Sequence, residues 1–215
     1  MILGIHASIA LGALRALEEA KVLSCAALQI LPYRRHHAPT DSELAGFRAA
    51  RPASGVRALL IHSRFVPSLA SSDEARRSRS VAHLAEELRL CAALGGDAYV
   101  LHAGAYSPGS DANAGIKLFA DSVRRAVEIS SFSGTLLLEN VPGGGRRMGG
   151  SFEELARLLD AVRPHVRSLG ACLDTAHAWA AGYDLSAAEA ALKFVARAHR
   201  LLGADAANLA VVRGL

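Results

Sequence analysis

Five polar side chains follow apolar segments of the sequence and carry the atom types that metals bind. His62, His102, Glu139 and Asp174 each stand at or just beyond the end of an apolar run. His177 follows Asp174 by three positions in "GACLDTAHAWAAGYD", where we expect a loop. A single histidine at such a place is usually structural, and a single acid there often caps the next helix. Recurrence at successive runs favours one shared site instead, because a divalent metal compensates a carboxylate buried among imidazoles.

These residue types suit one or two metal ions. His62, His102 and Glu139 form a His₂Glu set, which is typical of catalytic zinc with an open position for water. Glu139 and Asp174 lie on neighbouring predicted strands and can share a second metal, an arrangement that cleaves phosphodiesters in other enzymes. His6 ends the first predicted strand and is a candidate for lining the same site. We expect the remaining histidines to lie outside the site: His36, His37, His83, His165 and His199.

The elements that must position these residues are short β-type runs alternating with longer helical patterns. Strands are expected at 2–8, 24–30, 57–63, 97–103, 134–140, 169–175 and 208–214, with helices near 11–20, 41–50, 73–94, 114–131, 151–163 and 186–202. Repeated βα units imply parallel strands joined by right-handed crossovers. The pattern predicts an α/β fold of the (β/α)₈ TIM-barrel type, incomplete at the C-terminus, without the last helix and the eighth strand. In such a barrel the strand ends meet at one mouth. A doubly wound open sheet is the alternative, although no GxGxxG turn follows the first strand.

Composition places the chain among globular proteins. Its 215 residues are 51% hydrophobic, which suits one domain over residues 1–215, and no apolar run predicts a signal peptide or a membrane span, so we expect a soluble, cytoplasmic protein. Cys25, Cys91 and Cys172 show no CxxC spacing and are expected as reduced, buried thiols. A net charge of +4 with clustered arginines suits an anionic partner, but an Ala/Arg/Leu-rich composition explains many surface arginines by itself.

Several segments together resemble the endonuclease IV family, metal-dependent endonucleases that act at abasic sites in DNA and belong to the xylose isomerase-like barrels. The segments are "GIHASIALG", "IHSRF", "YVLHAGAYSPG", "LLLENVPGGGRRMGGSFEELARLLD" and "GACLDTAHAWAAGYDL", in the order of the family and over essentially the whole chain. The resemblance implies a zinc-dependent hydrolase of DNA base-excision repair that cuts the phosphodiester bond 5′ to an abasic site in double-stranded DNA. It also implies a monomer where the barrel is complete.

The resemblance assigns roles to individual residues. It implies that His62, His102 and Glu139 hold the first of three zinc ions, that Glu139 and Asp174 contribute to the second and that His177 contributes to the third, with Glu139 also expected to be catalytic. Ala176 stands where the family usually has Cys, and Phe65 stands where an aromatic residue, often Tyr, enters the DNA. The residues expected to contact DNA are Arg34, Arg35, Arg64, Phe65, Arg146 and Arg147.

The sequence printed here stops at Leu215, where the family would continue with a His-x-Asn-Asp element, an Asp-x-His pair and a final Glu. With the second and third sites incomplete, we expect cleavage slower than that of a full-length relative by at least about three orders of magnitude. DNA binding should fall less. Two alternatives remain open: a sugar isomerase or epimerase of the related barrels, and a non-catalytic DNA-binding remnant.

Overall fold

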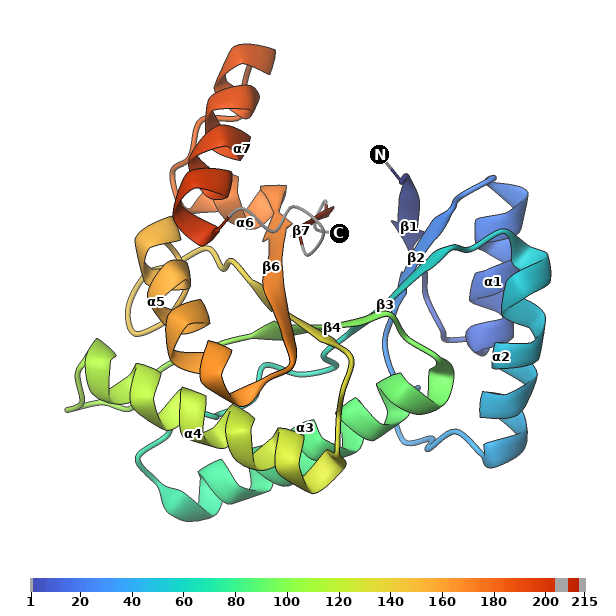
Figure 1. Ribbon diagram of the computed structural model, residues 1–215, viewed down its shortest axis with the longest axis horizontal. Helices are drawn as coiled ribbons and strands as arrows, with labels where there is room; N and C mark the ends of the chain where they lie inside the picture. Colours follow the sequence, from blue (N-terminus) through green and yellow to red (C-terminus); the bar gives the residue numbers. More distant parts are fainter. Residues whose placement is uncertain (1, 204–208, 213–215) are drawn as a thin grey trace.

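Seven parallel strands form one curved sheet in which each strand pairs with its neighbours in the sequence. The computed structural model describes residues 2–203 and 209–212. Within these residues β1 pairs with β2 alone and β7 with β6 alone, so the sheet curls without closing (Figure 1). The strands are β1 (Gly4–His6), β2 (Ala27–Ile30), β3 (Ala58–His62), β4 (Ala98–His102), β5 (Thr135–Glu139), β6 (Ser168–Asp174) and β7 (Leu209–Val212).

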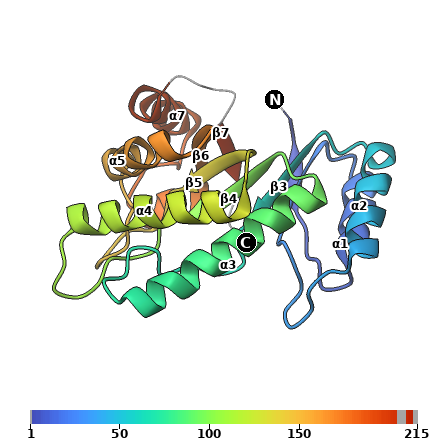
Figure 2. The same cartoon turned by 60° about the horizontal axis from the view of Figure 1, so that its bottom comes forward.

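Helices connect the strands and cover the outer side of the sheet (Figure 1). Helices α3 and α4 run side by side beneath it, as both views show, and make the most extensive contact between two helices (Figure 2). The helices are α1 (Ala13–Val22), α2 (Asp41–Ser54), α3 (Glu74–Leu94), α4 (Ala112–Ser130), α5 (Phe152–Val162), α6 (Thr175–Ala180) and α7 (Ala188–Leu202), with a 3₁₀ turn η1 at Arg163–His165. None of the helices in the described part of the chain combines the length and the apolar character needed to cross a membrane.

Local sequence sets where the helices begin and end. Thr40 closes a capping box with Glu43 at the start of α2, and the side chains of Asp73 and Ser151 accept backbone N–H groups at the starts of α3 and α5. Gly95 ends α3 with a φ of 72°, a left-handed conformation that glycine adopts without strain. These signals fix the lengths of the crossovers, and so the points at which the strands start and stop.

Residues of β3, β4, β5 and β6 alternate between two cores. Leu60, Val100, Leu137 and Cys172 pack together on the inner side, in a small cluster that also includes Ala98. The residues between them, such as Leu59 and Leu138, belong to the much larger core between sheet and helices. Because side chains on a strand alternate with a period of two, the residue two positions after each inner residue also faces inward. That rule points the last residues of β3, β4, β5 and β6 into the mouth of the sheet.

The expected fold class is confirmed. Every predicted strand has an observed counterpart whose ends lie inside the predicted range or one residue beyond it. The sequential strand order excludes a doubly wound sheet, in which the order would reverse. The sequence patterns did not predict α6 or η1, which are too short to show a helical period.

Candidate metal centre

His62, His102, Glu139 and Asp174 are the last residues of β3, β4, β5 and β6. Each lies two positions after a residue of the inner cluster, and so on the inner side of the sheet. The register pairs His102 directly with Glu139, while Asp174 extends two residues past the partner of Glu139. The prediction that these residues end successive strands at one mouth is confirmed.

The first group joins two imidazoles to one carboxylate. Nε2 of His62 lies 2.8 Å and Nε2 of His102 lies 2.9 Å from the same oxygen, Oε2 of Glu139. The ligand atoms of these residues all lie within 4.8 Å of one another. Glu139 is 2% exposed, whereas the two histidine side chains retain 17% and 14% exposure, so a small ion can approach from the mouth.

Hydrogen bonds fix the orientation and charge of this group. Nδ1 of His62 lies 2.8 Å from the Ser63 carbonyl, so both ring nitrogens face acceptors and a protonated ring satisfies both. Burial by itself lowers the pKa of His62, but the hydrogen bond and the charge of Glu139 outweigh it and raise the pKa. Burial by itself has the opposite effect on a carboxylate and raises the pKa of Glu139. Hydrogen bonds from His102 and His62 outweigh it and lower that pKa to about 2. The centre therefore favours an ionised carboxylate and positive charge beside it.

A divalent metal fits this donor set. Zinc takes imidazole nitrogen at about 2.0–2.1 Å and carboxylate oxygen at about 2.0–2.2 Å, so two of its ligand atoms lie at most about 4.3 Å apart. The two Nε2 atoms, at 2.8 and 2.9 Å from Oε2 of Glu139, are within that reach. The bond from Nδ1 of His62 to a carbonyl is the usual way in which a metal-binding imidazole is held, because it directs the other nitrogen to the ion. A cation would replace the proton that the arrangement otherwise places between Nε2 and Glu139.

A second group shares Glu139 with the first and adds Asp174 and His177, again with ligand atoms within 4.8 Å of one another. Asp174 is both the end of β6 and the N-cap of α6, since its Oδ1 accepts the backbone N–H of His177 at 2.8 Å. His177 was expected in a loop, and that expectation is wrong: it lies in the first turn of α6. The cap forces the chain into a helix immediately after the strand and brings the imidazole back over the carboxylates.

Asn140 holds this second group together, and sequence patterns gave no signal for it. Its side chain donates Nδ2–H to the Asp174 carbonyl at 3.0 Å and accepts the Asp174 N–H at 2.6 Å. Its own carbonyl accepts a hydrogen bond from Nδ1 of His177 at 2.9 Å, which leaves Nε2 of His177 for a ligand. A buried asparagine therefore clamps the end of β6 against β5.

His6, one candidate for lining the site, lies on the inner side beside the first group. Its ring stacks on that of His62 with the centroids 5.9 Å apart, and its Nδ1 lies 3.1 Å from Nε2 of Gln29. Burial, and then the charge of His62, lower the pKa of His6. Because the Gln29 amide donates to Nδ1, the neutral ring carries its hydrogen on Nε2.

The residues expected to contact DNA lie on the loops that follow β2, β3 and β5. Phe65 is 65% exposed, and Arg35, Arg146 and Arg147 are also exposed. Arg146 and Arg147 each donate to a carbonyl of the loops around them, at Tyr106 and Gly143. Their exposure leaves them accessible to an anion, and their DNA contacts stay a prediction.

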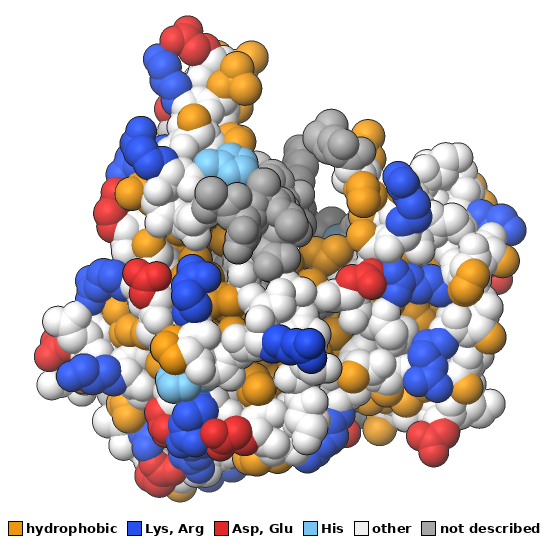
Figure 3. Space-filling model, in the orientation of Figure 1, with side chains coloured by type: hydrophobic (Ala, Val, Ile, Leu, Met, Phe, Trp, Pro, Cys, Tyr) orange, Lys and Arg blue, Asp and Glu red, His pale blue; other side chains and the backbone are white. Residues whose placement is uncertain are grey.

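Arg34 and Arg64 are more engaged with the protein. Arg34 lies 3.5 Å from Glu43 in an ion pair. Arg64 donates Nη1–H to the Tyr33 carbonyl at 2.7 Å, and its guanidinium lies over the rings of Tyr33 and Phe65. On the face of the molecule in Figure 3, basic side chains are scattered among acidic and apolar ones rather than gathered in one patch.

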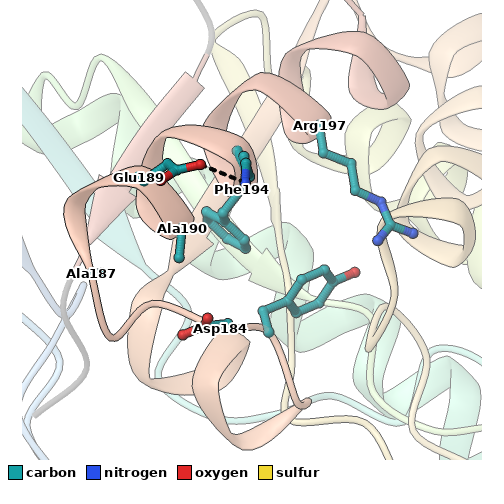
Figure 4. Close-up of a pocket in the computed structure, with 8 residues that line it drawn as sticks. Asp184, Ala187, Glu189, Ala190, Phe194 and Arg197 are labelled. Atoms are coloured by element: carbon teal, nitrogen blue, oxygen red, sulfur yellow. Dashed lines mark ion pairs between the residues drawn. The ribbon is translucent and has the colours of Figure 1, made fainter.

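A separate open pocket of about 430 Å³ lies against α7 and the loop before it (Figure 4). Its two cationic side chains, Lys193 and Arg197, are paired with Glu189 and Glu153 at 2.7 Å. Arg197 also lies over the ring of Tyr183. None of the residues of the two metal groups lines this pocket, so it is not part of the centre.

Comparison with known proteins finds the same fold and closely related sequences. The family described as "Xylose isomerase-like TIM barrel" matches residues 17–208. "Probable endonuclease 4" of Geobacter sulfurreducens is 32% identical over 208 residues, covering 94% of this chain and 70% of that protein. Its namesake of Methanoculleus marisnigri is 38% identical over 194 residues (88% and 68%), and that of Nitratidesulfovibrio vulgaris strain DP4 is 35% identical over 187 residues (85% and 65%). The chain thus spans about two thirds of the length of these relatives.

Solved structures agree. The crystal structure of endonuclease IV from Thermus thermophilus superposes with a TM-score of 0.78 at 33% identity, covering 94% of this chain and 72% of that one. A D-tagatose 3-epimerase-like protein superposes with a TM-score of 0.74 at 19% identity, covering 97% and 75%. At that identity the second likeness extends to the fold alone.

Proposed function

Because this chain belongs to the endonuclease IV family of xylose isomerase-like TIM barrels, we propose that it is a zinc-dependent endonuclease of DNA repair that hydrolyses the phosphodiester bond 5′ to an abasic site. One observation carries the proposal: two metal-ligand groups share the buried carboxylate of Glu139 at the mouth of the sheet. Shared carboxylates are typical of sites that bind adjacent metals around a phosphate.

Hydrolysis at this position breaks the bond between phosphorus and the O3′ atom of the nucleotide before the lesion. The oxygen of a water molecule joins the phosphorus and a proton goes to O3′. Metal ions at such a site lower the pKa of water and stabilise the negative charge of the transition state. The chain itself holds the ligands in place, through the Ser63 carbonyl behind His62 and through Asn140 behind Asp174 and His177.

The loops around the mouth suit a DNA backbone with a missing base. Phe65 offers an exposed aromatic ring in the loop just beyond His62, which can stack where a base is absent. Arg35, Arg146 and Arg147 are exposed on the two loops that flank the same mouth, and arginine forms strong bonds to phosphate. These contacts give affinity that depends on salt and not on base sequence.

Sugar epimerases with a similar fold provide the alternative, in which such a barrel acts on a small polyol. The exposed arginines and Phe65 favour a large anionic substrate over a sugar, because a polyol has no charge for several arginines to bind. Assaying epimerisation of a ketose beside DNA cleavage separates the two functions.

The test is a nicking assay with zinc and a labelled duplex that carries one abasic site. We expect a single cut 5′ to the lesion, loss of the cut in chelator, and loss of the cut in Glu139→Gln. Glu128→Gln is the matched control, since Glu128 lies on the surface of α4 in an ion pair with Arg124. A cut that survives in Glu139→Gln, or ketose epimerisation without any preference for the abasic duplex, would overturn the proposal.

A further inference from the structure

A second buried glutamate, Glu87, lies on α3 outside the metal centre and is 6% exposed. Its Oε2 accepts the hydroxyl of Tyr99, a fully buried residue of β4, and the backbone N–H of Arg64 at 3.2 Å. A carboxylate is costly to bury unless several donors bond to it, so these hydrogen bonds are what allows Glu87 to be buried. Neither metal group includes Glu87.

The Arg64 N–H fixes the start of the loop after β3 to α3. Further along the same loop, the Ser68 N–H donates to the hydroxyl of Ser80 at 3.0 Å, and Arg77 of α3 donates to the Ser71 carbonyl. Between these anchors stand Phe65 and Val66, with 65% and 61% of their surface exposed. The apolar tip of the loop is thus held on both sides by bonds to one helix.

Neighbouring loops brace the same tip. The guanidinium of Arg64 lies 5.2 Å from the ring centre of Tyr33 and 5.4 Å from that of Phe65, and it bonds the Tyr33 carbonyl. On the other side Gly104 approaches the Pro67 carbonyl so closely that a Cβ atom on Gly104 would lie 2.6 Å from it. The side chain of Arg64 therefore points back over the loop, and Phe65 is held outward.

We propose that Glu87 is a positioning residue for DNA binding: it anchors the loop after β3 through the Arg64 N–H, so that Phe65 stands as a rigid wedge beside His62. A wedge that is already ordered loses less entropy when it enters a duplex at a missing base, which favours damaged over intact DNA. The inference rests on the proposed function for its substrate, whereas the anchoring of the loop stands apart from it.

Three variants test the anchor. Glu87→Leu removes the acceptor, and Glu87→Gln keeps an oxygen that can accept the Arg64 N–H. Tyr99→Phe removes the hydrogen bond from the Tyr99 hydroxyl and leaves the carboxylate in place. The control is Glu86→Leu, the exposed neighbour on the same helix, which pairs with Arg89 on the surface. Thermal unfolding of each variant identifies any that fail to fold.

The first measurement is cleavage of the folded protein by trypsin after Arg64 and by chymotrypsin after Phe65, followed by mass spectrometry. We expect Glu87→Leu to be cleaved about tenfold faster than wild type, the size of one lost hydrogen bond to a charged group. Glu87→Gln and Tyr99→Phe should lie between the two, and Glu86→Leu should match wild type. If Glu87→Leu does not fold, the anchor is tested by the other variants: Glu87→Gln and Tyr99→Phe should be cleaved faster than Glu86→Leu, and equal rates would overturn it.

The second measurement is the affinity for a duplex with one tetrahydrofuran abasic analogue against the intact duplex, with zinc binding measured in parallel. We expect the preference for the abasic duplex to fall about tenfold in Glu87→Leu and to recover in Glu87→Gln, while zinc affinity stays at the wild-type value. Unchanged loop cleavage in Glu87→Leu would overturn the anchor. A wild-type protein without any abasic preference would overturn the proposed function and leave the cleavage result to stand.

Discussion

Two glutamates are buried almost equally in this protein, and their surroundings shift their pKa values in opposite directions. Glu139 at the mouth is 2% exposed and Glu87 beneath the loop after β3 is 6% exposed. Imidazoles surround Glu139, and hydrogen bonds from His102 and His62 overcome burial to lower its pKa to about 2. For Glu87 burial prevails over hydrogen bonds from Tyr99 and the Arg64 amide, and the pKa is raised.

The difference lies in the partners and not in the depth. An imidazole can carry a proton, or it can lose that proton and bind a metal ion. A positive charge therefore balances the Glu139 carboxylate in either state. Hydroxyl and amide donors orient a carboxylate but bring no full charge to it. A buried carboxylate surrounded by imidazoles can exchange protons for a metal ion and so forms a binding site. A buried carboxylate held by hydroxyl and amide groups serves instead as a structural anchor.

The largest effect should come from removing the shared carboxylate. In Glu139→Ala we expect zinc affinity to fall by about a thousandfold or more, because both ligand groups lose the same residue. Asp174→Ala should weaken only the second group. Competition with a chromophoric chelator measures both variants, and Glu128→Ala is the surface control. Equal losses in Glu139→Ala and Asp174→Ala would mean that the shared carboxylate matters no more to zinc affinity than a carboxylate of one group alone.

The opposite pKa shifts predict opposite pH dependence of stability in chelator-treated protein. Glu139 contributes stability that is fully present above its ordinary pKa of 4.5 and is lost as the pH falls toward 2. We expect Glu139→Gln to be less stable than wild type by about 3 kcal/mol near neutral pH, with the difference shrinking as the solution is acidified. Urea unfolding at a series of pH values measures it.

Glu87 provides the contrast in the same experiment. An acid whose pKa is raised on folding destabilises the folded state when it ionises. This loss of stability is absent below the ordinary pKa of 4.5 and develops as the pH rises through the raised pKa of the folded state. Wild type should therefore lose stability relative to Glu87→Gln as the pH rises. If the stability differences of Glu139→Gln and Glu87→Gln from wild type changed with pH in the same direction, the opposite pKa shifts of the two glutamates would be contradicted.

A smaller effect should follow loss of the clamp behind the centre. Asn140→Leu leaves the N–H and the carbonyl of Asp174 buried without their partners, and we expect the free energy of unfolding to fall by about 2 kcal/mol. Zinc binding by the first group should persist. Asn113→Leu is the matched control, because Asn113 is exposed on α4 and its side chain bonds Arg157 on the surface. Urea unfolding and zinc titration together distinguish a clamp from a general defect in folding.

The smallest effect should be seen in the exposed loops. The double variant Arg146→Ala/Arg147→Ala should weaken DNA binding about tenfold at low salt and reduce the slope of log affinity against log salt by about two. Zinc affinity should be unchanged, since the side chains of both arginines bond loop carbonyls and not ligand residues. A fall in zinc affinity in this variant would mean that the two arginines also support the metal centre.

The sequence predicted the strand ends because their signal is local. Each of His62, His102 and Glu139 follows its own apolar run at the same offset, and the period of two along a strand then decides the side that it faces. The fold class followed from the same repetition of strand and helix.

The residues that sequence patterns missed have partners far along the chain. Asn140 bonds Asp174 across 34 positions, and Arg64 reaches Glu87 across 23. A polar residue inside a helical pattern gives no sign of whether it is buried, so Glu87 could not be told from its exposed neighbour Glu86. The short helix that holds His177 is likewise determined by a side-chain cap and not by a hydrophobic period.

The double use of Asp174 limits how this part of the sequence can evolve. One of its oxygens starts helix α6 by accepting the His177 N–H, and the other remains for a ligand. A substitution at Ala176 leaves both uses intact because that side chain is exposed. Insertion of a single residue would instead rotate His177 by about 100° around the helix and remove the cap at the same time. The segment should therefore accept a change of residue at Ala176 and no change of length.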